Sequence, residues 1–204
     1  LDTKDVDQYL QQIKKDKFSC DTIGFTGGEP FMNKDIISIL NLCRKENYNI
    51  LILTNAMQPM LNKIKELKTF AKYKKLIIRV SLDHYTKEGH EYLRGKNSWD
   101  KALKGIRWLA DNKFNINIAS RIIDKNEKLL RDGFAKLFKD NNLKIDAYNK
   151  NELVVFPEMN SQSDTPEITT DCWDILNTDP RNMMCSNSRM IVKRREDSKT
   201  HIVS

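Results

Sequence analysis

The chain has 204 residues, of which 39% are hydrophobic, so it is long enough to bury the core of one sizeable domain and is too apolar for a disordered tail. No segment approaches the roughly 20 consecutive apolar residues of a membrane helix, and the first residues lack the basic start and apolar stretch of a signal peptide. The net charge of +7 is spread along most predicted helices, which favours a solvated surface over a nucleic-acid-binding face. Four cysteines are too few for a disulfide scaffold, and we expect a cytoplasmic protein without a membrane partner.

Short β-rich segments alternate with amphipathic segments along the chain. The first amphipathic segment has helical spacing of its apolar residues and Thr3 as the expected N-cap. A later helix is expected to begin after Ser98, which is a good N-cap residue, and the stretch before Ser98 is polar and loosely patterned. Helices are predicted over residues 3–16, 33–46, 59–70, 98–112 and 126–139, and strands over 22–26, 50–54, 76–82, 115–120 and 153–156.

This alternation predicts an α/β fold with a parallel sheet wrapped by helices. After Phe156 the composition changes, because residues 157–166 contain two prolines and no apolar periodicity. Two apolar segments, 190–193 and 201–204, flank a polar stretch and predict a β-hairpin. We therefore expect one domain over residues 1–158, followed by a linker and a hairpin in residues 159–204.

Polar residues follow the predicted strands where each strand ends. They are Thr26 to Glu29, Thr54 and Asn55, Ser81 and Asp83, and Ser120 and Arg121. In a parallel β/α sheet the loops at the carboxyl ends of the strands converge on the ligand. Strand ends are polar in any soluble sheet, so capping of loops is the alternative role for Asn55 and Ser81.

The segment Gly27-Gly28-Glu29-Pro30 is the most informative of these strand ends. Two glycines allow backbone groups to approach a ligand without a Cβ in the way, the Glu29 carboxylate can hold an ammonium group, and Pro30 fixes the exit from the turn. These features suit an amino-acid ligand. A phosphate loop would need a lysine after the glycines, and an acidic residue there would repel phosphate.

These residues resemble a known family. The segment from Ile23 to Phe31 is similar to the second-strand motif of radical S-adenosylmethionine (SAM) enzymes. Leu53-Thr-Asn55, Val80-Ser-Leu-Asp83 and the stretch from His90 to Gly95 agree with later motifs of that family in order and spacing. The resemblance covers about residues 1–158 and implies a partial (β/α)6 TIM-like barrel without its first strand.

The resemblance also implies roles for individual residues. Gly27, Gly28 and Glu29, with Pro30 closing the turn, would bind the amino group of the methionine moiety of SAM. Asn55 would lie near the cofactor. Ser81 and Asp83 would contact the ribose or the carboxylate, and Arg121 the carboxylate, although a surface or substrate contact is an equal alternative for Arg121. No catalytic residue is singled out.

One family feature is absent from the sequence. Radical SAM enzymes bind a [4Fe–4S] cluster through a Cys-x3-Cys-x2-Cys loop, and no such triplet occurs here. Cys20 precedes the second-strand motif, and Cys43 has the surroundings of a buried thiol. We therefore expect a fragment of a longer protein that begins after this loop, with the cluster ligands outside it. A cluster-free, non-catalytic ligand-binding protein is the alternative.

The tail carries a weaker resemblance. Cys172, Cys185 and the predicted hairpin are similar to the start of SPASM-type extensions, which hold auxiliary iron–sulfur clusters. This tail resemblance implies a peptide or protein substrate. The radical SAM resemblance implies that the intact protein cleaves SAM reductively, with electrons from a donor such as flavodoxin or ferredoxin, and abstracts hydrogen from the substrate. Ordinary buried thiols are the alternative for both cysteines. The charge of +7 leaves an RNA-modifying role as a further alternative.

Overall fold

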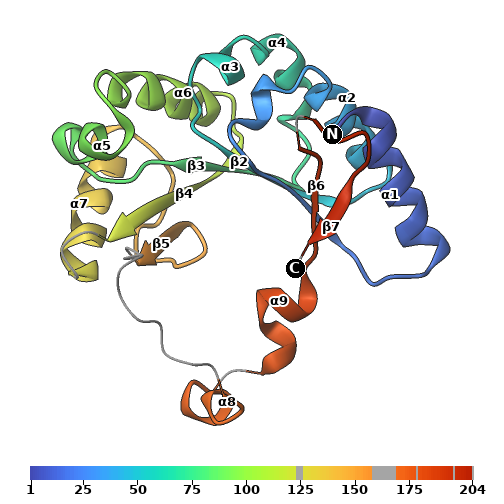
Figure 1. Cartoon of the computed structure of the whole chain (residues 1–204). Helices are drawn as coiled ribbons and strands as arrows, with labels where there is room; N and C mark the ends of the chain where they lie inside the picture. The colour runs from blue at the N-terminus through green and yellow to red at the C-terminus, as the bar shows by residue number, and fades with distance from the viewer. Residues whose placement is uncertain (123–125, 158–168, 178, 195, 204) are drawn as a thin grey trace.

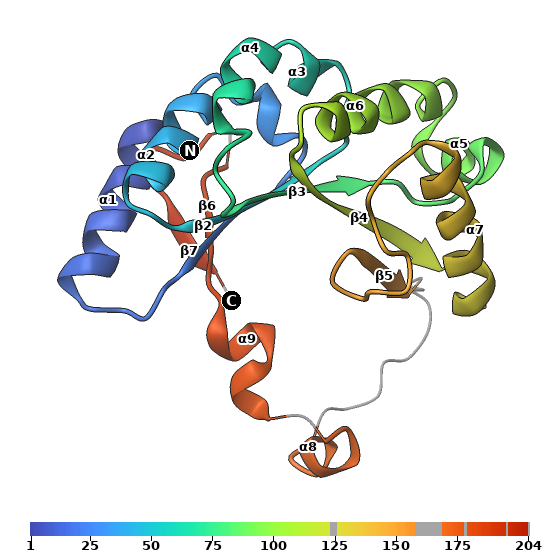
Figure 2. The same ribbon diagram turned by 180° about the vertical axis from the view of Figure 1, so that it is seen from behind.

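The computed structural model describes residues 1–122, 126–157, 169–177, 179–194 and 196–203. Five parallel strands form one curled sheet in the order β1-β2-β3-β4-β5, and the helices lie along its convex face (Figures 1 and 2). This confirms the expected partial barrel. The strands are β1 (Thr22–Phe25), β2 (Asn49–Thr54), β3 (Leu76–Ser81), β4 (Asn115–Ile122) and β5 (Leu153–Pro157). Around them lie α1 (Thr3–Lys15), η1 (Pro30–Met32), α2 (Ile36–Lys45), α3 (Gln58–Leu61), α4 (Ile64–Leu67), η2 (Lys68–Phe70), α5 (Lys87–Arg94), α6 (Trp99–Asp111) and α7 (Glu127–Asp140).

The two faces of the sheet differ in burial. On the helix side of β3, the side chains of Leu76, Ile78 and Val80 are at most 1% exposed and belong to the main core. The alternate residues of this strand, Ile77, Arg79 and Ser81, are half-buried and therefore face the concave side. A parallel sheet that is covered on both faces reads as continuously apolar. The alternation seen here leaves polar side chains on the concave face, where a ligand can meet them.

The N-cap of α1 is Asp2, so the prediction of Thr3 was wrong by one residue. The Asp2 side chain accepts hydrogen bonds from the backbone N–H groups of Lys4 and Asp5, both at 2.9 Å. The Asp5 carboxylate in turn accepts from the Asp2 N–H at 2.9 Å, which completes a capping box. A carboxylate in that reciprocal arrangement satisfies two N–H groups, and Thr3 becomes the first helical residue.

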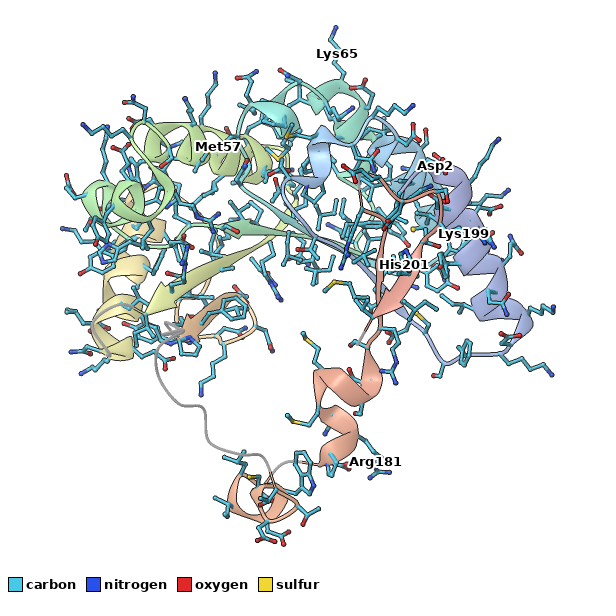
Figure 3. All side chains as sticks on the ribbon, viewed as in Figure 1. Asp2, Met57, Lys65, Arg181, Lys199 and His201 are labelled. Atoms are coloured by element: carbon cyan, nitrogen blue, oxygen red, sulfur yellow. The ribbon has the colours of Figure 1, made fainter. Side chains whose placement is uncertain are left out.

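The single helix predicted over residues 59–70 is three short pieces, α3, α4 and η2. Its apolar residues Leu61, Ile64, Leu67 and Phe70 recur every three positions, whereas an α-helix has 3.6 residues per turn. A continuous helix would therefore rotate this row steadily away from the core. The breaks keep Leu67 and Phe70 fully buried, while Figure 3 shows Lys65 pointing outward.

The polar stretch before Ser98 contains a helix, α5, which the sequence pattern did not reveal. Thr86 caps this helix by accepting a hydrogen bond from the Gly89 N–H at 3.2 Å, and Gly95 ends it with a φ of +91°. Ser98 stands at the N-cap position of α6 but makes no side-chain cap. Its hydroxyl instead donates to the Gly95 carbonyl at 2.7 Å and so joins α5 to α6.

The tail consists of α8 (Cys172–Ile175), η3 (Pro180–Asn182), α9 (Met184–Asn187) and an antiparallel hairpin of β6 (Met190–Val192) and β7 (His201–Val203). The hairpin was expected, and it returns to α1. Lys193 forms an ion pair with Asp5 at 2.9 Å, and the Tyr9 and Thr200 hydroxyls are 2.6 Å apart. Figure 3 shows Lys199 and His201 on the side of the molecule where α1 lies. The predicted boundary at 158/159 lies outside the described residues.

None of the helices in the described part of the chain is long and apolar enough to cross a membrane.

Candidate functional site

The turn after β1 has an open backbone. Gly27 and Gly28 have φ values of +93° and +54°, in a region that L-residues adopt only with strain. A Cβ built at either glycine would meet no heavy atom within 4 Å. Glycine therefore adopts this conformation without strain, and the space that the missing side chains leave is accessible to a ligand. Pro30 is buried and begins η1 directly after the turn.

Glu29 fixes this turn to the neighbouring strand. Its carboxylate is buried and accepts hydrogen bonds from the Phe31 N–H at 3.1 Å, the Thr54 hydroxyl at 2.7 Å and the Asn55 N–H at 2.8 Å. These donors belong to η1 and to the end of β2. Both oxygens of the carboxylate are thus already engaged by the chain. The main effect of Glu29 is to position the turn. An ammonium group at this site would contact the backbone of Gly27 and Gly28 in addition to the Glu29 carboxylate.

Asn55 lies next to Glu29, as the alignment of strand ends predicts. Its side-chain oxygen accepts a hydrogen bond from the Met57 N–H at 2.9 Å, which is the loop-capping role that was considered for it. The Thr54 hydroxyl bridges in the same way, since it donates to Glu29 and accepts from the Ala56 N–H at 3.0 Å. Thr54 is the partner of Glu29 that the sequence analysis did not select as a site residue.

Asp83 is the centre of a second polar group, at the ends of β3 and β4. Its carboxylate accepts from Arg94 Nε at 2.5 Å and Nη2 at 3.2 Å, and from Arg121 Nη2 at 3.0 Å. The Asp83 side chain is 4% exposed, against 36% for Arg94 and 43% for Arg121. Burial raises the pKa of Asp83, but the hydrogen bonds and charges of the two arginines outweigh it, and the net pKa is lowered. Asp83 therefore stays ionised and holds both guanidinium groups at the site.

The backbone of Asp83 is held as firmly as its side chain. Its N–H donates to His90 Nδ1 at 3.2 Å, and its carbonyl accepts from the Ser120 hydroxyl at 3.0 Å. His90 is fully buried, and burial lowers its pKa, so the ring is neutral, carries its proton on Nε2 and packs near Trp99. Arg94 and His90 were missed as site residues, although the Leu93-Arg94-Gly95 motif had been noted.

Ser81 completes the carboxyl edge of the sheet. Within the described part of the chain its hydroxyl has no hydrogen-bond partner, and the side chain faces the concave side. The strand register places Thr54 opposite Val80 and Ser81 opposite Ala119. The Gly27–Pro30 turn, Asn55, Ser81, Asp83 and Arg121 are therefore brought together along four adjacent strand ends.

The cysteines do not form a comparable group. Cys43 is fully buried, and burial raises the pKa of its thiol to about 12, so it is an inert core residue. Cys20 and Cys172 are half-buried and reduced, and Cys185 lies in α9 with a side chain outside the described residues. No group of three His, Cys, Asp or Glu side chains in the described ranges could hold a metal ion. The described residues therefore do not provide the ligands of a [4Fe–4S] cluster.

A half-barrel of parallel strands with a glycine turn and polar strand ends defines an α/β protein with a cofactor site at its carboxyl edge. The sequence model of the radical SAM superfamily matches residues 1–124, and the chain belongs to this superfamily. The protein is also similar to the antilisterial bacteriocin subtilosin biosynthesis protein AlbA of Bacillus subtilis (strain 168). The two are 30% identical over 129 residues, which cover 63% of this chain and 28% of AlbA.

Solved structures share the fold at low sequence identity. SuiB of Streptococcus suis has a TM-score of 0.62 and 18% identity, over 87% of this chain and 38% of SuiB. The enzyme anSMEcpe, solved with bound AdoMet, has a TM-score of 0.60 and 17% identity, over 85% of this chain and 52% of that chain. The chain thus spans about a quarter to a half of the length of these proteins.

Proposed function

We propose that the whole protein is a radical SAM enzyme that cleaves SAM reductively and abstracts hydrogen from a peptide or protein substrate. The observation that carries this proposal is the open Gly27-Gly28 turn, held by a buried Glu29 at the carboxyl edge of the sheet, in a chain of the radical SAM superfamily.

The chain's own residues suit the parts of SAM in order along this edge. The backbone of Gly27 and Gly28 would receive the methionine ammonium group, with Glu29 holding the turn and adding negative charge. The free Ser81 hydroxyl would hydrogen-bond the ribose or the carboxylate. Arg121, oriented by Asp83, has further N–H groups for the carboxylate. These assignments are proposals for binding and orientation.

The [4Fe–4S] cluster is proposed for the whole protein, with its thiolate ligands outside the described residues. When bound, SAM and a reduced [4Fe–4S] cluster supply the hydrogen-abstracting radical chemistry that this superfamily uses. A flavodoxin or ferredoxin is the proposed electron donor, and the cytoplasm is the proposed location.

The relatives support a peptide substrate. AlbA carries the name of a bacteriocin biosynthesis protein, and SuiB has been solved bound to the precursor peptide SuiA, with a TM-score of 0.61 to this chain. We infer the same substrate class here.

The tail is proposed to be the start of a C-terminal extension, with the domain boundary near residue 158. Cys172 and Cys185 are the proposed ligands of an auxiliary cluster, together with thiolates elsewhere in the protein. Iron analysis of the reconstituted whole protein tests this assignment: Cys172→Ala and Cys185→Ala should each lower the iron content, while Cys43→Ala should not. Unchanged iron in both tail variants would leave these two cysteines as ordinary thiols.

The function is tested with the full-length protein reconstituted with iron and sulfide. With SAM and dithionite it should release 5′-deoxyadenosine, and without reductant it should not. Binding of SAM with neither incorporation of iron nor release of 5′-deoxyadenosine would favour the cluster-free, non-catalytic alternative. Failure to bind SAM at all would contradict the site itself.

A further inference from the structure

Arg79 occupies an unusual position on the concave face of the sheet. It lies in the middle of β3, between Leu53 of β2 and Asn117 of β4 in the strand register. It shares the concave face with Ser81, which follows two residues, or about 7 Å, closer to the carboxyl edge. Arg79 therefore lies deeper in the half-barrel than the residues proposed for SAM.

The guanidinium of Arg79 has no partner within the described part of the chain. No hydrogen bond or ion pair involves it, and its Nε atom is fully buried. Burial lowers the pKa of this arginine, and no carboxylate of the described residues lies close enough to raise it. Arg79 is half-buried, and its buried Nε donor lacks an acceptor, whereas buried polar groups in folded proteins almost always have partners. An acceptor from outside the described residues would satisfy this donor.

The charges around Arg79 show that the site is short of anions. The strand positions that share the concave face contain no aspartate or glutamate: these are Thr22, Gly24, Asn49, Leu51, Leu53, Ile77, Asn115, Asn117, Ala119, Val154 and Phe156. At the edge, the Asp83 carboxylate is shared between Arg94 and Arg121, and Glu29 is bound by three donors. SAM has a single carboxylate, and the proposed function places it at the carboxyl edge of the sheet, near Ser81 and Arg121. Among the described residues of the concave face, Arg79 is therefore the cation that lacks an anionic partner.

We propose that Arg79 is a substrate-binding residue that pairs with a carboxylate of the peptide, from an aspartate or glutamate side chain. This subsite rests on the proposed function, because it takes a peptide as the occupant of the half-barrel. The planar guanidinium favours a carboxylate over a single-point acceptor, since its paired N–H groups match both oxygens. The peptide would thereby be oriented from the floor of the half-barrel, below SAM.

The test is ligand-observed saturation-transfer NMR on the full-length protein with its cluster oxidised. The probe is N-acetyl-glutamate α-amide, whose only charge is its side-chain carboxylate, and the matched neutral compound is N-acetyl-glutamine α-amide. We expect saturable binding of the glutamate probe and at least about tenfold weaker binding of the glutamine compound. Arg79→Met should weaken binding of the glutamate probe by at least about tenfold. Arg79→Lys should weaken it by a smaller factor, because lysine keeps the positive charge but loses the paired N–H groups of the guanidinium. Arg107→Met on the exposed side of α6 is the matched control and should bind as the unsubstituted protein does.

Several outcomes would overturn the proposal. Equal binding of the two probes would show that recognition is not anionic. Displacement of the glutamate probe by SAM would show that Arg79 holds the cofactor carboxylate. A large drop in melting temperature for both Arg79→Met and Arg79→Lys would show that the guanidinium has a structural partner. The titration needs no electron and no SAM cleavage, so its failure and the failure of the proposed function are distinguishable.

Discussion

Replacing Glu29 with glutamine tests whether its carboxylate holds the cofactor turn. The carboxylate accepts from three donors, two of which are the backbone N–H groups of Phe31 and Asn55. Glutamine keeps the shape but offers one acceptor oxygen, and its NH2 group must face at least one of these donors. Losing a charge-assisted hydrogen bond at a buried site costs about 1.5–3 kcal/mol, which corresponds to about a 10- to 150-fold change in a local opening equilibrium.

The assay is amide hydrogen exchange of the peptide that contains Asn55, followed by the dissociation constant of SAM. In Glu29→Gln the Asn55 amide should exchange about 10- to 150-fold faster, and SAM should bind more weakly because the turn is no longer fixed. Glu29→Ala should weaken SAM binding further, since all three donors lose their acceptor. Glu66→Gln on the exposed surface of α4 is the control and should change neither quantity. Unchanged exchange and unchanged SAM affinity in Glu29→Gln would refute the positioning role.

Three further predictions concern charged and thiol groups. The pKa of Asp83 is lower in the folded protein than in the unfolded chain, where it is about 4. The ionised carboxylate therefore stabilises the fold fully above about pH 4, and this stabilisation is lost as the pH falls through the lower folded pKa. The urea midpoint of the unsubstituted protein should fall more steeply below about pH 4 than the midpoint of Asp83→Asn. Burial raises the pKa of the Cys43 thiol to about 12, so this thiol should not react with iodoacetamide in the folded protein at pH 8. Mass spectrometry should find Cys20 alkylated first and Cys43 unmodified. Rapid alkylation of Cys43 in the folded protein would contradict this. Asp5→Asn should speed amide exchange in the hairpin by a small factor, because it removes the solvent-screened ion pair between Asp5 and Lys193. Unchanged exchange in the hairpin would show that other contacts dock it.

The parallel sheet and the edge at which its polar strand ends gather could be predicted from the sequence, and the partial-barrel arrangement followed from the resemblance to radical SAM enzymes. Each strand is a short β-rich segment between helices, and that alternation permits few arrangements other than a parallel sheet. Once the sheet is parallel, polar residues at the strand ends must lie on one edge. The glycines of the turn were recognisable for the same local reason, since glycine adopts positive φ values without the strain that a Cβ brings.

The contacts that hold the site together were not predictable in the same way. The pairing of Asp83 with Arg94 depends on α5, a helix whose stability comes from its cap, its buried His90 and its link to Asp83 rather than from apolar periodicity. The hydrogen bond from Thr54 to Glu29 joins the end of β2 to the turn that follows β1, two segments that lie far apart in the sequence. Residues 59–70 were misjudged because a spacing of three was treated as helical. Each of these features is decided by tertiary packing, which a local pattern does not contain.

The central claim is that the Gly27-Gly28 turn forms one wall of the SAM site, and Gly28→Ala tests it most directly. A methyl group at Gly28 meets no protein atom within 4 Å, so the folded protein should pay only about 1–2 kcal/mol for the positive φ of +54°. The same methyl group would enter the space assigned to the methionine moiety. In the full-length protein, Gly28→Ala should raise the dissociation constant of SAM by about tenfold or more with a nearly unchanged melting temperature. An unchanged SAM affinity in a folded Gly28→Ala protein would contradict the account.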